Sequence, residues 1–276
     1  MNALQQEYHD ALSLMQGRDI LVIGDMVADI YLDGRISRIS REAPVLVLEQ
    51  AGEKIVAGGA ANVVNNIATL GGTVHAAGLV GRDESADGLR AILAKNGADV
   101  RGLISDESRP TISKTRIIAG GRATVSQQIV RIDKESKEPV HPVIEAELRA
   151  YIESVLPTVE GVVISDYGSG TVTEGLQTLL IDYCRAKGIP SIVDSRYAVH
   201  EIPVSDKSEV FDVSGAGDTC VATVILALAA GAEPALAARL SNIASGIAVR
   251  KLGTSTVSVR ELAEAVEKQH PEYPSK

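Results

Sequence analysis

The stretch that decides the fold is Asp212-Val213-Ser214-Gly215-Ala216-Gly217-Asp218, which continues directly into an apolar run from Thr219 to Ala232. Its small residues allow consecutive backbone amides to turn toward one point. The apolar run predicts a buried helix, whose free N–H groups and positive dipole end would face that same point. The stretch therefore predicts an anion site at the N-terminus of a helix.

Asp218 is the residue that suggests chemistry at this anion site. A carboxylate beside groups arranged for phosphate is electrostatically unfavourable unless it handles a proton. We therefore interpret the site as one of phosphoryl transfer, in which Asp218 accepts the proton of an attacking hydroxyl and the backbone amides hold charge on the moving phosphoryl group. These amides belong to Gly215, Ala216 and Gly217. The alternative is a helix start at which the glycines form a turn and Asp218 caps the helix; spacing alone leaves both open.

The stretch from Asp212 to Asp218 resembles the C-terminal signature of the ribokinase (PfkB-type) sugar kinases, in which the last Asp is the catalytic base and the glycine turn is the anion hole. The chain has no G-x-x-x-x-G-K-[ST] loop, and Cys220 occupies the last glycine position of the dinucleotide fingerprint. The resemblance implies a ribokinase-like three-layer α/β fold with a mainly parallel sheet and a small β-sheet lid. It also implies ATP and Mg²⁺, and related kinases often hold a monovalent cation near the anion hole.

Composition bounds the class of protein. With 276 residues and 45% hydrophobic content, we expect residues 1–276 to form a single large domain with a substantial core. A net charge of -9 and only 3% aromatic residues argue against a nucleic-acid partner. The two cysteines lack metal-like spacing. Because residues 1–15 do not resemble a secretory signal and the longest apolar run is shorter than ~20 residues, we expect a soluble cytoplasmic protein without a membrane partner.

Asp25 follows a short continuous apolar run, Ile20-Leu21-Val22-Ile23-Gly24, of the kind buried in a parallel sheet. Ligands of open α/β sheets bind at the carboxyl ends of the strands, so Asp25 is placed to accept hydrogen bonds from sugar hydroxyls. The alternative is an Asp that forms a turn.

Asp166 and Asp194 end two further predicted strands, Gly161–Asp166 and Ile189–Asp194. The helix predicted from Thr173 to Lys187 between them indicates a parallel crossover. Contact with the substrate or a metal shell and simple loop capping stay equally open for both carboxylates.

A small separate sheet, the lid, is predicted within residues 31–50 and 112–132, where it would exclude water from phosphoryl transfer. Between these segments lies Ala57-Gly58-Gly59-Ala60-Ala61-Asn62. This stretch resembles the N-terminal signature of the family, which implies that Gly58, Gly59 and Asn62 contact the sugar. The alternative is a simple turn that opens a helix.

Several stretches are similar to one branch of the family, the D-glycero-β-D-manno-heptose-7-phosphate kinases that supply ADP-heptose for lipopolysaccharide. The likeness spans nearly the whole chain. It implies ATP-dependent phosphorylation of heptose 7-phosphate at its anomeric hydroxyl, O1. The stretches that carry it are Ser37-Arg38-Ile39-Ser40, Glu42-Ala43-Pro44-Val45, Lys114-Thr115-Arg116, Gln127-Gln128, Ser165-Asp166-Tyr167-Gly168 and Lys251-Leu252-Gly253-Thr254.

A substrate phosphate far from Asp218 needs cations that the glycine turn does not supply, and Arg suits this task because its planar fork holds two phosphate oxygens. The candidates are Lys114, Arg116 and Arg196. Adenine would have to pack on aliphatic residues around Asn242 to Ile247, since aromatic residues are scarce. We assign the nucleotide side to Asp212, Ser214, Asn242 and Ser245.

The chain also departs from the family pattern. Arg41 stands where the branch usually has Pro, Ser169 where it has Lys, and Thr223 where the signature expects Ala or Gly. More seriously, Tyr197 to Glu209 joins the strand that ends in Val193-Asp194-Ser195-Arg196 directly to the glycine turn. The family has an Asn-x-x-Glu motif, a helix and a strand between the two, so that roughly 40–50 residues are missing. The His-x-Gly-His motif of a nucleotidyltransferase half is absent as well.

Two functions remain open for such a chain, and a third is less favoured. The first is an ATP-dependent sugar kinase that acts as a homodimer on a small sugar phosphate. The second is a sugar-phosphate binding or regulatory protein with an incomplete nucleotide site, which the intact sugar half beside an interrupted ATP half would fit. The third is a nicotinamide oxidoreductase, which the lack of a dinucleotide fingerprint disfavours.

Overall fold

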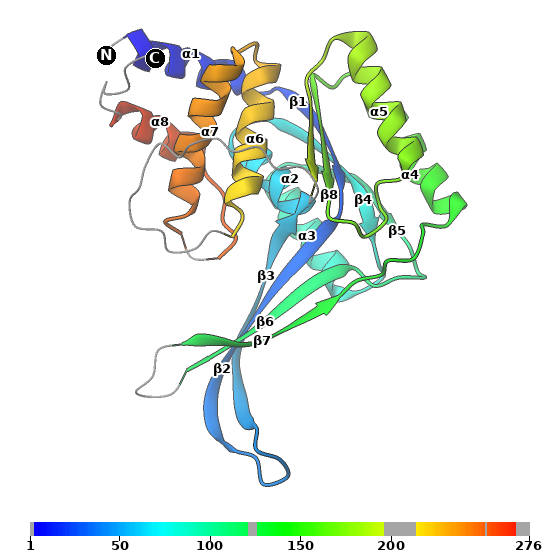
Figure 1. Ribbon diagram of the computed structural model, residues 1–276, viewed down its shortest axis with the longest axis vertical. Helices are drawn as coiled ribbons and strands as arrows, with labels where there is room; N and C mark the ends of the chain where they lie inside the picture. Colours follow the sequence, from blue (N-terminus) through cyan, green and yellow to red (C-terminus); the bar gives the residue numbers. More distant parts are fainter. Residues whose placement is uncertain (1–2, 121–125, 196–213, 252, 269–276) are drawn as a thin grey trace.

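The computed structural model describes residues 3–120, 126–195, 214–251 and 253–268. A five-stranded sheet with the order β5-β4-β1-β8-β9 forms its centre (Figure 1). The strands are β1 (Asp19–Gly24), β4 (Thr73–Val80), β5 (Asp99–Ser105), β8 (Gly161–Asp166) and β9 (Ser191–Ser195). All the pairings in this sheet are parallel, so the connections cross its faces, as the crossover predicted between β8 and β9 requires.

Strand β1 shows why helices cover both faces of the sheet. Ile20 and Val22 join one apolar core, whereas Leu21 and Ile23 join another, because successive side chains of a strand point to opposite faces. The helices of the first core are α1 (Ala3–Met15), α2 (Ala60–Thr69), α3 (Glu84–Lys95), α6 (Ala216–Ala229), α7 (Pro234–Ala248) and α8 (Val259–Glu267). Those of the second core are α4 (Pro142–Val155) and α5 (Glu174–Lys187). The three-layer α/β fold predicted from the sequence is confirmed.

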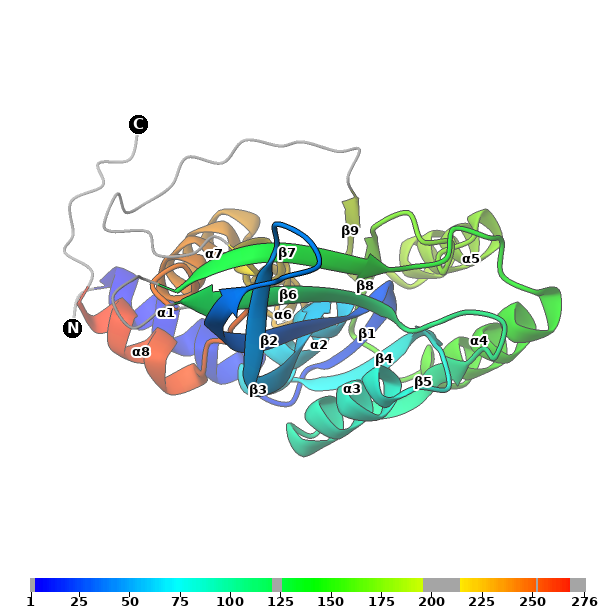
Figure 2. The same cartoon turned by 90° about the horizontal axis from the view of Figure 1, so that it is seen from below.

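A second sheet lies outside these layers and has the strand order β3-β2-β6-β7. Its strands are β2 (Met26–Ile39), β3 (Leu46–Gly59), β6 (Ile112–Gly120) and β7 (Gln127–Lys134). Strand β2 pairs antiparallel with β3 and parallel with β6. The hairpin of β2 and β3 extends away from the helices (Figure 1), and β6 and β7 lie beside it (Figure 2). This is the separate small sheet expected from residues 31–50 and 112–132.

The strands of this lid sheet are longer than the sequence pattern suggests. Strand β2 begins at Met26, directly after Asp25, and the backbone ladder continues until Met26 pairs with Gly59. Gly58 and Gly59 therefore end a strand, rather than forming a loop between the lid strands. Met26 and Gly59, which end the ladder, are 33 residues apart, so a local sequence pattern does not contain the pairing that extends these strands.

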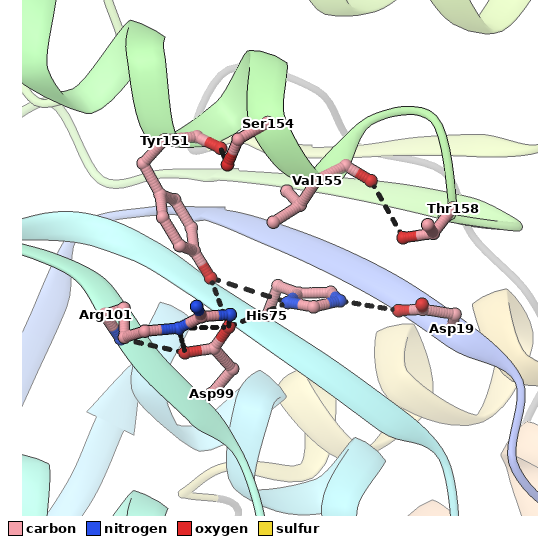
Figure 3. Close-up of polar contacts among 8 residues, drawn as sticks. All are labelled: Asp19, His75, Asp99, Arg101, Tyr151, Ser154, Val155 and Thr158. Carbon is pink, nitrogen blue, oxygen red and sulfur yellow. Dashed lines mark hydrogen bonds and ion pairs between the residues drawn. The ribbon is translucent and has the colours of Figure 1, made fainter.

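At the edge of the main sheet where the strands begin, a polar cluster ties β1, β4 and β5 to α4 (Figure 3). His75 lies between two carboxylates, with Nε2 2.9 Å from Asp19 Oδ1 and Nδ1 3.2 Å from Asp99 Oδ2. The Tyr151 hydroxyl donates to Asp99 Oδ2 at 3.1 Å, and Arg101 forms an ion pair with the same carboxylate. This cluster lies opposite the edge where ligands of such sheets bind, so we assign it a structural role.

In the part of the chain that the structure describes, no helix is both long enough and apolar enough to cross a membrane. Both cysteines are free thiols, and Cys184 is buried in the second core, where burial raises the pKa of its thiol.

Candidate functional site

The candidate site lies at the carboxyl ends of β1 and β8, where segments far apart in the sequence meet. Asp25 follows β1, Tyr167 follows β8, and Asp218 lies in the first turn of α6. Helix α2 packs against α6 and brings Asn62 to the same place. The parallel sheet thus gathers at one edge several of the side chains that the sequence pointed to.

Asp218 is held by both of its carboxylate oxygens. Asn62 Nδ2 donates to Oδ2 at 2.7 Å, and the Tyr167 hydroxyl donates to Oδ1 at 3.1 Å. The N-cap of α6 is Gly215, which has a φ of 78°, and no side chain caps this helix. The alternative in which Asp218 serves as a helix cap is therefore wrong; its carboxylate faces the site.

The electrostatics suit Asp218 to proton transfer. Only 8% of the residue is exposed, and burial is the main reason that the pKa of its carboxyl is raised to about 6. The hydrogen bonds from Asn62 and Tyr167 lower this pKa, while the charges of Asp194 and Asp29 raise it. Burial, followed by the Asp218 charge, raises the pKa of Tyr167, so its phenol stays protonated and donates. A carboxylate whose pKa lies near neutral pH is well suited to accept the proton of an attacking hydroxyl group.

Asp25 is fully buried and organises the loop after β8. Its Oδ2 accepts the backbone N–H groups of Tyr167 at 2.8 Å and Ser169 at 3.1 Å. Its Oδ1 has no hydrogen-bond partner among the described residues. Because a buried acceptor without a partner costs free energy, this atom is compatible with the prediction that Asp25 accepts from a sugar hydroxyl. The loop contacts also give Asp25 a structural task.

The glycine pair Gly58-Gly59 is required by close packing against acidic residues. A Cβ at Gly58 would lie 2.5 Å from Asp29 Oδ2. Gly59 has a φ of 53°, and a Cβ there would lie 2.9 Å from the Asp25 carbonyl oxygen. The pair is therefore more than a simple turn, since it allows the end of β3 to approach Asp25 and Asp29. Contact of these glycines with a sugar stays a prediction.

Two lid cations approach this region from β6. Arg116 Nη1 donates to Asp29 Oδ1 at 2.6 Å, and the Thr254 hydroxyl donates to Asp29 Oδ2 at 3.1 Å. Lys114 Nζ lies 5.7 Å from the centroid of the Tyr167 ring. Lys114 is thus next to the group that holds Asp218, whereas Arg116 is committed to an ion pair that a substrate phosphate would have to share.

The residues assigned to the nucleotide lie on α7 and around the start of α6. The Ser245 hydroxyl donates to the Ala216 carbonyl at 3.1 Å and so fixes the first turn of α6. Asn242 lies on the same helix as Ser245, and Ser214 directly precedes the N-cap Gly215. Contact of these residues with ATP stays a prediction. Arg196 and Asp212, which the sequence also assigned to ligands, lie outside the described residues.

The sequence left the roles of Asp166 and Asp194 open, and the two carboxylates have different surroundings in the structure. Asp166 Oδ1 accepts the N–H of Gly168 at 2.8 Å, which is the loop-capping arrangement. Asp194 on β9 is half-buried, and burial raises the pKa of its carboxyl. Its charge raises the pKa of both Asp218 and Tyr167, and contact of Asp194 with a substrate or a metal shell stays a prediction.

Sequence reasoning did not assign roles to Tyr167, Asn66, Asp29 or Thr254, which all contribute to this arrangement. A signal existed for two of them. Tyr167 follows the end of a predicted buried strand, and Asn66 is one helical turn after Asn62 on the same face of α2. Thr254 stands in one of the stretches that resemble the family branch, but no local signal marks its contact with Asp29, which is 225 residues away.

Comparison with known proteins places the chain among sugar kinases. It is 34% identical to the bifunctional protein HldE of Mesorhizobium japonicum, over 95% of this chain and 64% of that protein. It is 35% identical to the HldE of Geobacter sulfurreducens, over 93% of this chain and 64% of that protein. The chain therefore spans 64%, less than two thirds, of the length of these relatives.

Solved structures share the fold at low sequence identity. Ribokinase of Arabidopsis thaliana in complex with ribose and ATP has a TM-score of 0.55 and 13% identity, covering 92% of this chain and all of that one. Phosphofructokinase-2 of Escherichia coli in complex with substrates and products has a TM-score of 0.66 and 18% identity, covering 91% of this chain and 98% of that one. The ribokinase-like fold with its separate sheet is thereby confirmed.

The alignments also bear on the segment that the sequence indicated to be missing. The alignment with the M. japonicum protein spans 325 positions, although this chain has 276 residues in all, so part of the relative has no counterpart here. The family model for pfkB family carbohydrate kinases matches in two pieces, residues 18–203 and 188–261, which overlap at residues 188–203, where the Tyr197–Glu209 junction begins. Since these pieces together cover most of the sequence, the chain belongs to the pfkB family of carbohydrate kinases.

Proposed function

We propose that this protein phosphorylates D-glycero-β-D-manno-heptose 7-phosphate at O1 with ATP, giving heptose 1,7-bisphosphate for ADP-heptose and lipopolysaccharide core synthesis. The observation that carries the proposal is the buried Asp218, which titrates near pH 6 at the N-terminus of α6 in a carbohydrate-kinase fold. The similarity to HldE over nearly the whole chain supports the heptose branch.

In this mechanism the protein's own groups orient the reactants and move one proton. Asn62 and Tyr167 hold the Asp218 carboxylate, which accepts the proton of the sugar O1 hydroxyl as that oxygen attacks the γ-phosphorus of ATP. The bond between this phosphorus and the β–γ bridging oxygen breaks, and ADP leaves. The free N–H groups at the start of α6 stabilise the negative charge on the transferred phosphoryl group. The lid sheet would close over the sugar and keep water from competing with O1.

Mg²⁺ would neutralise phosphate charge during the transfer. Among the described residues there is no group of three or more His, Cys, Asp or Glu side chains that could hold a metal ion. This fits Mg²⁺ that is bound mainly by ATP phosphates and water with one or two protein carboxylates. Asp194 is the described carboxylate best suited to this task, because its charge already acts on Asp218. A monovalent cation near the anion hole stays an expectation.

The substrate assignment predicts a preference among sugars. We expect kcat/KM to be higher for heptose 7-phosphate than for unphosphorylated heptose, ribose or fructose 6-phosphate. Lys114→Ala should raise KM for heptose 7-phosphate by about 10- to 100-fold, as expected for the loss of one charge-assisted hydrogen bond. Steady-state kinetics on the four sugars checks both results. Lys54→Ala, which removes an exposed lysine from β3 of the same sheet, is the matched control. A preference for any of the other three sugars would overturn the substrate.

The second candidate is a sugar-phosphate binding or regulatory protein with an incomplete nucleotide site. The departure from the family pattern favours it, because the family resemblance implies that the absent Asn-x-x-Glu segment belongs to the ATP side. Calorimetry separates the two functions. A kinase should bind Mg·ATP with micromolar affinity as well as heptose 7-phosphate, whereas the regulatory protein should bind only the sugar phosphate. The protein used must first be shown by intact mass to be the 29.0 kDa chain.

We also expect the protein to act as a homodimer. Large apolar side chains are exposed on the lid sheet and at the turn between β2 and β3, namely Ile39, Val45, Leu46, Ile129, Val130 and Ile132. A second copy of the chain that covers this surface would remove these side chains from water.

A further inference from the structure

Helix α2 carries two buried asparagines one turn apart, and the second has no part in the mechanism above. Asn62 is 1% exposed and Asn66 is 0% exposed. Asn66 Oδ1 accepts from the Thr219 hydroxyl at 3.1 Å and from the Val257 backbone N–H at 3.3 Å. Its Nδ2 donates to the Asn62 carbonyl at 2.9 Å and to Asn62 Oδ1 at 3.2 Å. Every polar atom of this buried amide is therefore used.

Two of these partners leave the Asn66 amide only one orientation. The Val257 N–H can only donate, so it must face the oxygen of Asn66. The Asn62 backbone carbonyl can only accept, so it must face the nitrogen. A flipped Asn66 would place an oxygen against a carbonyl and an NH₂ group against an N–H, leaving both buried pairs unmade.

The orientation of Asn66 in turn decides that of Asn62. Because Asn66 Nδ2 points at the side-chain oxygen of Asn62, the Asn62 NH₂ group is directed at Asp218, to which it donates at 2.7 Å. If Asn62 turned over, its oxygen would face the Asp218 carboxylate and its NH₂ would face that of Asn66. Both contacts would then be repulsive.

We infer that Asn66 is a positioning residue for proton transfer, which orients the Asn62 amide so that it donates to the carboxylate of Asp218. The relay runs from the backbone before α8, through two asparagines of α2, to the first turn of α6. The role of Asn66 in turnover rests on the function proposed above. The effect of Asn66 on the Asp218 carboxyl does not depend on that function, since these hydrogen bonds are present in the free protein.

The sharpest test is Asn66→Asp, which keeps an oxygen for Thr219 and Val257, removes the donor to Asn62 and adds a carboxylate. The Asn62 amide is then shared between the introduced carboxylate and Asp218. We expect the titration midpoint of the Asp218 carboxyl to rise from about 6 by on the order of one pH unit. The measurement is ¹³C NMR of aspartate-labelled free protein, with the Asp218 signal assigned from Asp218→Asn. The acid limb of kcat/KM against pH should move by the same amount.

The matched control is Asn65→Asp, which adds the same charge to the neighbouring position of α2. Asn65 is partly exposed and pairs with the exposed Asn96 rather than with the site. In this variant the titration midpoint of the Asp218 carboxyl should stay within about 0.3 pH unit of the wild-type value, because solvent and salt screen a surface charge.

A neutral double-mutant cycle shows whether the effect travels through Asn62. Asn66→Ala should raise the Asp218 midpoint in the wild-type background and leave it unchanged in Asn62→Ala. If both Asn66 variants lower the melting temperature but leave the Asp218 midpoint in place, the inference is wrong and Asn66 only ties α2 to α6. A shifted midpoint in a protein that phosphorylates no sugar would uphold the relay and overturn the kinase assignment.

Discussion

Replacing Asp218 by Asn is expected to lower kcat by ~10²–10⁴ while sugar binding stays nearly intact. The amide keeps the shape of the carboxylate but cannot accept the proton of the attacking hydroxyl. Because the base must be deprotonated, kcat/KM of the wild-type protein should fall as the pH drops below about 6. Kinase assays and calorimetry measure the two effects. Asp182→Asn on the exposed surface of α5 is the control for the substitution itself. A drop in kcat of less than threefold would show that Asp218 is not the base.

The same substitution should make the fold more stable at neutral pH. The pKa of Asp218 is raised from 3.8 to about 6, so the native state binds this proton more tightly than the unfolded state does. Stability arising from this group is present below pH 4 and is lost as the pH rises through 6. At about 1.4 kcal/mol per pKa unit, Asp218→Asn should add up to about 3 kcal/mol to the free energy of unfolding at pH 8. Urea titrations at pH 8 and pH 4 check the sign, since the gain should be small at pH 4.

Gly215→Ala is expected to be the most damaging small substitution in the loop before α6. Gly215 has a φ of 78°, and a Cβ there would lie 2.7 Å from Asn62 Nδ2. Asn62 is buried and hydrogen-bonded, so it can yield only by breaking its contact with Asp218. We expect a loss of about 1–3 kcal/mol in unfolding free energy and a drop in kcat on the order of 10²-fold, since the base and its partner are displaced together.

Gly217→Ala is the stability control for this prediction. A Cβ at Gly217 meets nothing within 4 Å, and its φ is not in the left-handed region. In a helix Ala is more stable than Gly by up to about 1 kcal/mol, so this variant should unfold no more easily than the wild type. Equal losses of stability for both variants would mean that the contact with Asn62 does not explain the cost at Gly215.

The sequence by itself determined the elements whose causes are local. The run Ile20–Gly24 is apolar at successive positions, and the strand it forms is buried on both faces. Ser258 and Glu261 have the spacing of a capping box, and α8 begins with that box. Gly215 permits the left-handed turn that starts α6. Each of these outcomes follows from residues within a few positions of one another, so a sequence pattern contains the information.

Only the tertiary structure decided how the site is assembled. The sequence left open whether Asp218 caps the helix, and the contacts that turn its carboxylate away from the helix end come from Asn62 and Tyr167, which are 156 and 51 residues away. Arg116 was expected on a substrate phosphate, but the pairing of β6 with β2 brings it to Asp29. The registers of strands and the packing of α2 against α6 set these contacts. Such long-range pairings depend on the free energy of the whole fold, which the residue type at one position does not reveal.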